Sequence, residues 1–182
     1  GTKLSYREAG LSNETAIVQV HGLGTGHHNY DLLTPHLESH LHVYDIDLPG
    51  YGSSEQAGHG REISDFAKDV AEFIEALGLA PVHLHGTSMG GCIAMVLAGQ
   101  RPDLIKRLVV TCSFGRFDHA SRIIFDTWRM AAAHGIEELA LITSQQGFSR
   151  SFWDRAGSEN TVAAFVTALG SMTPAEFLRD LE

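Results

Sequence analysis

Short apolar, β-branched segments alternate with helical segments through residues 16–113, and this alternation constrains the fold of the 182-residue chain more than any other feature. Such alternation is typical of a mostly parallel sheet that helices cover on both faces, so we predict an α/β fold. We expect strands at residues 3–10, 16–20, 42–48, 81–86 and 105–113, and helices at residues 34–40, 64–78 and 90–100.

The segment 64–78 has the clearest helical pattern. Its apolar residues recur at helical spacing and fall on one face: Phe66, Val70, Phe73, Ile74 and Leu77. Ser64 is the expected N-cap, and Gly78 is expected to end the helix.

The pattern changes after Ser113. Only helical segments follow, at residues 118–135, 136–147, 158–170 and 173–182. We therefore predict two parts, an α/β core over residues 1–116 and a helical appendage over residues 117–182. The last segment begins with a capping box at Thr173, and its apolar stripe still continues at Glu182. This indicates that the sequence belongs to a longer chain and that further C-terminal strands are missing from it.

Charge and composition exclude several classes of partner. The chain has 13 basic and 22 acidic residues and a net charge of −9, which argues against nucleic acid and anionic membranes. No apolar run is long enough to span a bilayer. Cys92 and Cys112 lie in apolar runs and are expected to be buried free thiols, which favours a reducing, cytoplasmic location. The 11 histidines form no ligand set, so we predict no metal and no cofactor.

Ser88 lies between two glycines where an apolar strand becomes a helix, in the stretch VHLHGTSMGGCIAMVLAG. A strand, the pattern Gly-x-Ser-x-Gly and a helix together are typical of a nucleophile elbow. Gly86 and Gly90 would remove side chains that clash across so sharp a turn, and Gly91 would let the helix approach closely. The alternative is a glycine-rich turn in which the serine is structural.

A second glycine-rich loop, HGLGTG at residues 21–26, also follows a strand. Acyl transfer needs two backbone N–H donors for the oxyanion, and we predict that Leu23 and Met89 supply them. A phosphate-binding loop is the alternative, but the spacing of its glycines and the absence of a following Gly-Lys argue against it. His21 is expected to brace this loop, and Asp47 to cap the turn amides that follow it.

The motifs VHGLG, DLPGYGSS and GTSMGG, in this order, resemble the α/β-hydrolase superfamily. The resemblance implies that residues 117–182 form the cap, or lid, of such an enzyme. The stretch GTSMGG, with serine at position 88, resembles the corresponding stretch of esterases, enol-lactonases, cofactor-free haloperoxidases and carbon–carbon bond hydrolases. It is unlike haloalkane dehalogenases and soluble epoxide hydrolases, which have aspartate there. The cap aromatics Phe125, Trp128, Phe148 and Trp153 would then line an apolar cavity or simply pack together.

The resemblance also implies a triad in the order serine, acid, histidine. The positions that would carry the acid and the histidine are absent from this chain. Asp118 is the one internal candidate for the acid, and His119 and His134 for the base; His59 precedes the serine and does not match.

The expected function is hydrolysis of an ester, lactone or related small acyl substrate by Ser88. A complementary C-terminal segment, in cis or on a partner chain, would supply the acid and the base. The alternatives are a carbon–carbon hydrolase of meta-cleavage products and a non-catalytic ligand-binding protein on the same fold.

Overall fold

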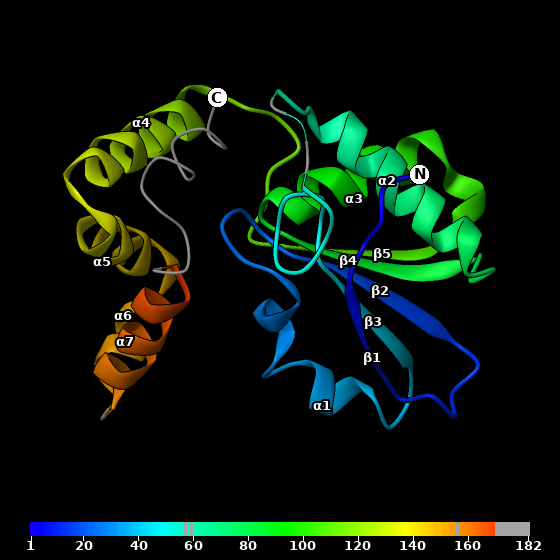
Figure 1. Ribbon diagram of the computed structural model, residues 1–182. Helices are drawn as coiled ribbons and strands as arrows, with labels where there is room; N and C mark the ends of the chain where they lie inside the picture. The colour runs from blue at the N-terminus through cyan, green and yellow to red at the C-terminus, as the bar shows by residue number, and fades with distance from the viewer. Residues whose placement is uncertain (57, 59, 156, 170–182) are drawn as a thin grey trace. The chain divides into compact units, whose positions relative to one another are not determined.

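The computed structural model describes residues 1–56, 58, 60–155 and 157–169 (Figure 1). The chain divides into two compact units, Gly1–Gly115 and Arg116–Glu182. The helix expected from Thr173 onward lies outside the described residues, as does His59.

The first unit is built on a five-stranded sheet with the order β1-β3-β2-β4-β5. Only β1 is antiparallel to its neighbour; β3, β2, β4 and β5 pair in parallel, which confirms the mostly parallel sheet. The strands are β1 (Tyr6–Ala9), β2 (Ala16–Val20), β3 (His42–Ile46), β4 (Val82–Thr87) and β5 (Ile105–Thr111).

Two long helices, α2 (Ile63–Ala76) and α3 (Met89–Gln100), lie together on one face of this sheet, and the short α1 (Thr34–Leu37) lies on the other (Figure 1). Two 3-10 turns, η1 (His27–Tyr30) and η2 (Pro102–Leu104), complete the unit. Alternate strand residues and the apolar faces of α2 and α3 form the core, which includes Val18, Val20, Ile46, Leu84, Ile74, Ile93 and Leu97, each at most 1% exposed.

The start of α2 differs from the expectation. Ser64 is not the N-cap, because the helix begins at Ile63 and Glu62 is its N-cap. The Glu62 carboxylate accepts the Asp65 backbone N–H, and the Asp65 carboxylate accepts the Glu62 N–H at 2.9 Å. This reciprocal pair satisfies two otherwise free donors, so it is preferred to a single serine hydroxyl. Gly78, with φ of 63°, ends the helix as expected.

The described part of the second unit is helical. It contains α4 (His119–His134), α5 (Ile136–Gly147), α6 (Arg150–Trp153) and α7 (Ser158–Leu169). α5 packs against α4 and α7, and Leu139 and Ala140 of α5 are fully buried. The Asp118 carboxylate accepts the Ser121 N–H at 2.9 Å and thereby caps α4.

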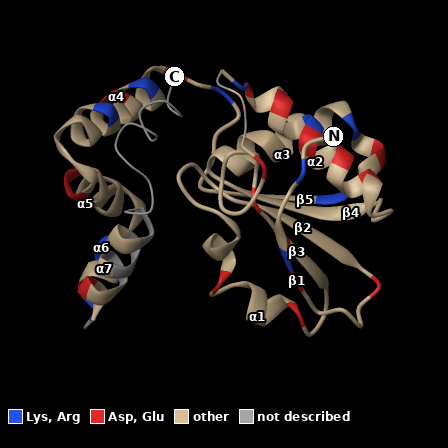
Figure 2. Cartoon of the chain, in the orientation of Figure 1, with Lys and Arg blue, Asp and Glu red and all other residues tan. Residues whose placement is uncertain are grey.

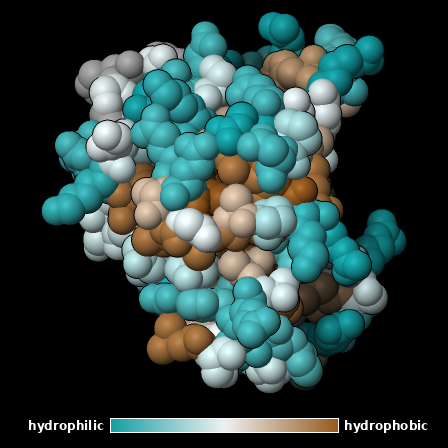
Figure 3. Space-filling model, turned by 90° about the vertical axis from the view of Figure 1, so that its right-hand side faces the viewer, coloured by the Kyte–Doolittle hydropathy of each residue, from teal (hydrophilic) through white to brown (hydrophobic). Residues whose placement is uncertain are grey.

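Charged side chains are concentrated on the helices, and the central strands β2 and β4 carry none (Figure 2). Apolar side chains also reach the surface, and Figure 3 shows one face on which they gather between hydrophilic neighbours. In β5, Leu108, Val109 and Val110 are 36–48% exposed. None of the helices in the described part of the chain has the length and hydropathy of a membrane span.

The two cysteines are not buried as expected. Cys92 is partly exposed and Cys112 is exposed. Both are free thiols. Cys112 directly follows β5, which is an edge strand with β4 as its neighbour. An apolar segment is buried only where another strand or layer packs against it. The local sequence does not show whether such a neighbour is present, so the expected burial was wrong.

Candidate active site

Ser88 occupies the single position between the end of β4 and the start of α3. Its backbone has φ of 55° and ψ of −118°, a conformation that side chains other than glycine rarely adopt. The expected elbow geometry is therefore present. Strain of this kind persists only where the surroundings hold it, and it gathers at functional sites.

The glycines around Ser88 are required by close backbone contacts. A Cβ on Gly86 would lie 2.1 Å from the Gly90 carbonyl oxygen. A Cβ on Gly90 would lie 2.0 Å from the Val20 carbonyl oxygen, and one on Gly91 would lie 2.5 Å from the Ser113 Cβ. The turn and the start of α3 can thus approach β2 and β5 only because these positions lack side chains.

The loop 21–26 lies at the same edge of the sheet as Ser88. It follows β2, which pairs in parallel with β4. A Cβ on Gly22 would lie 3.2 Å from the Ser88 Cβ and 3.8 Å from its Oγ. Leu23 is the next residue of the loop, and Met89 is the first residue of α3. Their roles as oxyanion donors remain predictions.

His21 braces the loop, as the sequence suggested. Its ring is fully buried, with Nδ1 2.7 Å from the Gly22 carbonyl oxygen, and Nε2 accepts the Leu48 N–H at 3.0 Å. Burial lowers the pKa of His21 to about 4. The ring is therefore neutral at neutral pH, which is the form that can donate through Nδ1 and accept through Nε2.

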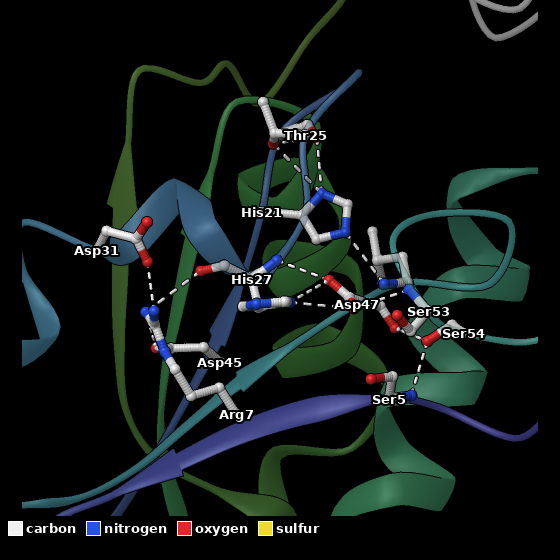
Figure 4. A network of polar contacts seen from close by, with 12 residues as sticks. Ser5, Arg7, His21, Thr25, His27, Asp31, Asp45, Asp47, Ser53 and Ser54 are labelled. Carbon is white, nitrogen blue, oxygen red and sulfur yellow. Dashed lines mark hydrogen bonds and ion pairs between the residues drawn. The ribbon is translucent and has the colours of Figure 1, made fainter. Parts of the chain in front are cut away.

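Asp47 holds the loop and the following turn together (Figure 4). Its buried carboxylate accepts the Ser53 N–H at 3.1 Å and the His27 N–H at 2.7 Å, and it contacts the His27 ring at 3.0 Å. Burial acts to raise the pKa of Asp47, but the hydrogen bonds from His27 and Ser53 outweigh it and the pKa is lowered. Asp47 thus caps the turn amides as expected, and it also fastens the far end of the loop 21–26.

A buried polar network on the α1 side of the sheet was not predicted. Gln19 lies level with Asp45 of β3 and with His85 of β4 in the strand register. Its side-chain amide donates to the Asp45 carboxylate at 2.6 Å, and its oxygen lies 3.0 Å from the His85 Nδ1. His85 continues the network to the Thr111 hydroxyl at 3.1 Å. Each of the three strands β2, β3 and β4 has a polar residue inside an apolar run. This shared pattern was the one feature of the sequence from which the network could have been predicted.

The candidates for the acid and the base belong to the second unit. Asp118 and His119 lie at the start of α4, where Asp118 serves as the N-cap. His134 lies at the end of α4, and its Nδ1 is 2.8 Å from the Met130 carbonyl oxygen. The roles of Asp118, His119 and His134 as acid and base remain predictions.

The aromatic side chains of the second unit form two local groups. Phe125 lies with Trp128, their ring centroids 5.1 Å apart, and Phe148 lies with Trp153, 5.9 Å apart. The Trp128 indole N–H donates to the Gln146 side chain at 2.8 Å. These contacts are internal to the helical unit, and the lining of a substrate cavity stays a prediction.

The family of the chain follows from a sequence comparison. A family model described as the alpha/beta hydrolase fold matches residues 15–158. The chain belongs to the α/β-hydrolase family. Its first unit contains the β4–Ser88–α3 turn, and no group of three or more potential metal ligands occurs in the part of the chain that the structure describes.

Several members of the α/β-hydrolase family are similar to this chain in sequence. It is 34% identical over 106 residues to an (E)-2-((N-methylformamido)methylene)succinate hydrolase of Acinetobacter baylyi, covering 58% of this chain and 40% of that protein. It is 36% identical over 101 residues to a pimeloyl-[acyl-carrier protein] methyl ester esterase of Neisseria meningitidis, covering 56% and 38%. A monoacylglycerol lipase of Xenopus laevis is 34% identical over 117 residues, covering 62% and 35%. The chain thus matches well under half the length of these relatives.

Solved structures share the fold along this chain. A hydrolase from Pseudomonas aeruginosa has a TM-score of 0.78 at 26% identity, covering 100% of this chain and 68% of that one. The enol-lactonase from Burkholderia xenovorans has a TM-score of 0.83 at 24% identity, covering 100% and 69%. At this identity the second likeness shows the fold alone.

Proposed function

We propose that the protein is a serine hydrolase that cleaves a carboxylic ester, lactone or related acyl substrate, with Ser88 as the nucleophile. The observation that carries the proposal is the backbone of Ser88, which is held at φ of 55° on the tip between β4 and α3. The closeness of Gly22 to Ser88 adds support, because it brings the loop that carries the Leu23 amide to the same place.

In the proposed reaction, the Ser88 Oγ attacks the carbonyl carbon of the substrate while a histidine takes its proton. The amides of Leu23 and Met89 donate to the oxyanion that forms. The tetrahedral intermediate collapses to an acyl-enzyme, and the histidine returns its proton to the leaving alcohol. Water then repeats these steps and releases the acid. We propose that the histidine and its orienting acid come from sequence outside this chain, in cis or on a complementary segment.

The similarity to proteins named esterase and lipase favours an ester or related acyl bond over a carbon–carbon bond. The bracing contact of His21 also supports the proposal. It fixes the Gly22 carbonyl group, and the Leu23 N–H belongs to the same peptide group, so its direction is fixed as well.

The test is turnover of p-nitrophenyl acetate by the full-length protein and by its Ser88→Ala variant, with Ser64→Ala as the matched control. Ser64 is an exposed hydroxyl in the first turn of α2. We expect Ser88→Ala to lower kcat by at least about 10³-fold, because the nucleophile is lost. Ser64→Ala should keep full turnover. Equal turnover in Ser88→Ala would overturn the proposal, and ligand binding without turnover in the unmodified protein would favour the non-catalytic alternative.

A further inference from the structure

Two residues other than glycine have a positive φ in the described part of the chain, Ser88 at 55° and Cys112 at 51°. They lie on neighbouring segments, because Ser88 follows β4, Cys112 follows β5, and these strands are paired (Figure 1). Cysteine has no special preference for this conformation, so the surrounding contacts must hold it there.

The residues on either side of Cys112 hold both backbone groups of Ser88. The Ser88 N–H donates to the Thr111 carbonyl oxygen at 2.9 Å. The Ser113 hydroxyl donates to the Ser88 carbonyl oxygen at 2.7 Å. Cys112, with its positive φ, therefore lies between the residue that accepts the Ser88 N–H, Thr111, and the residue that donates to the Ser88 carbonyl group, Ser113.

These two contacts act on different dihedral angles. The N–H contact restrains φ of Ser88, and the carbonyl contact restrains ψ. The Ser88 carbonyl also accepts the Gly91 and Cys92 N–H groups, at 2.9 and 3.2 Å, as the first acceptor of α3. The Ser113 hydroxyl is thus a contact from outside the helix, and it ties the elbow to the segment that directly follows β5.

The sequence of α3 leaves room for this contact. A Cβ on Gly91 would lie 2.5 Å from the Ser113 Cβ and 2.7 Å from its Oγ, so a side chain there would displace Ser113. The Cys92 Sγ lies 3.4 Å from the Ser113 Oγ, where the thiol can donate to the hydroxyl oxygen. Ser113 is therefore held in place by the same helix whose first carbonyl it contacts.

We propose that residues 111–113 clamp the elbow and that Ser113 is a positioning residue for the Ser88 hydroxyl. The clamp keeps Ser88 in its strained conformation, so that Oγ stays in the direction needed for attack. The role of Ser113 in catalysis rests on the proposed function of Ser88. The clamp on the Ser88 backbone does not depend on that function.

Ser113→Ala and Ser113→Thr test the clamp in the full-length protein, with Ser64→Ala as the control. We expect Ser113→Ala to lower kcat for p-nitrophenyl acetate about tenfold with little change in KM, because misplacing a reacting group affects the chemical step. Ser113→Thr keeps a hydroxyl and should restore most of kcat. A purely structural serine would not separate kcat from KM in this way.

A second measurement does not depend on activity. We expect amide hydrogen exchange at Ser88, followed by NMR, to become about tenfold faster in Ser113→Ala, because local opening of the turn becomes easier. Exchange in α2 should stay the same. Unchanged kcat and unchanged Ser88 exchange in Ser113→Ala would overturn the clamp. If Ser88→Ala keeps turnover while Ser113→Ala still speeds exchange at Ser88, the proposed function fails and the geometric clamp stands.

Discussion

Gly90, in the first turn of α3, lies directly against the carbonyl group of Val20 at the end of β2: a Cβ at position 90 would come within 2.0 Å of that oxygen. The same Val20 oxygen accepts the Tyr30 hydroxyl at 2.7 Å. One peptide group at the end of β2 thus contacts both the helix after Ser88 and a residue from η1. The geometry of the Ser88 turn and of the loop 21–26 is therefore set together.

Replacing Gly90 by alanine should lower the free energy of unfolding by about 3 kcal/mol, because the added carbon must displace backbone. Gly99 provides a control in the same helix, since a Cβ there meets nothing within 4 Å. We expect Gly99→Ala to change stability by no more than about 1 kcal/mol, in the stabilising direction. Urea unfolding of both variants measures the difference, and equal effects would contradict the close contact.

His21 should make stability depend on pH in the acidic range. Burial lowers its pKa from 6.5 to about 4, so between these values the unfolded chain binds more protons than the folded one. The contribution is complete above pH 6.5 and is lost as the pH falls through 4, by about 3 kcal/mol in total. His21→Gln keeps a donor and an acceptor but does not titrate, so its unfolding free energy should vary less with pH. Identical pH profiles for the two proteins would show that His21 is not buried in its neutral form.

Asp47→Asn should destabilise the first unit more than the same change at Asp31. The buried Asp47 carboxylate accepts from two backbone N–H groups, and an amide would turn a donor toward one of them. We expect a loss of about 2 kcal/mol in the free energy of unfolding. Asp31, whose side chain is 57% exposed and paired with Arg7, should lose less than about 1 kcal/mol. Similar losses at both positions would contradict the cap.

The pH dependence of the Asp47 cap has the sign of a lowered pKa. Its stabilisation is present above the unfolded value of 3.8 and is lost as the pH falls through the lower folded value. The free energy of unfolding of the Asp47→Asn variant, measured across this acidic range, should therefore fall less with pH than that of the unmodified protein.

Asp118 offers a direct test of the one internal candidate for the catalytic acid. Asn is also a good N-cap, so Asp118→Asn should preserve α4 and remove only the charge. If the acid lies elsewhere, kcat for p-nitrophenyl acetate should stay within about twofold, whereas loss of a triad aspartate lowers it about 10⁴-fold. Circular dichroism of Asp118→Asn, compared with Asp118→Ala, confirms that the cap is retained.

The sequence alone determined the order of the five strands and of the longer helices, though not the short α6 or the 3-10 turns η1 and η2, and it determined the form of the Ser88 turn. Both are local properties. Apolar periodicity reports which face of an element is buried, and glycines at positions 86, 90 and 91 report close backbone approach, because side chains there would collide. The bracing role of His21 was also readable in part: its contact with the Gly22 carbonyl oxygen is local, whereas its contact with the Leu48 N–H joins residues 27 apart in the sequence.

Tertiary structure alone decided the environment of Cys112, the network around Gln19 and the contact of Ser113 with Ser88. Each depends on which strand lies beside which, and that order is not the order of the chain. The positive φ of Cys112 has no local signal in the sequence, and the contacts on either side of it, from Thr111 and Ser113, are with Ser88, more than 20 residues away. The sequence therefore identified the residue proposed to attack the substrate, and the packing of β5 against β4 revealed what holds that residue in place.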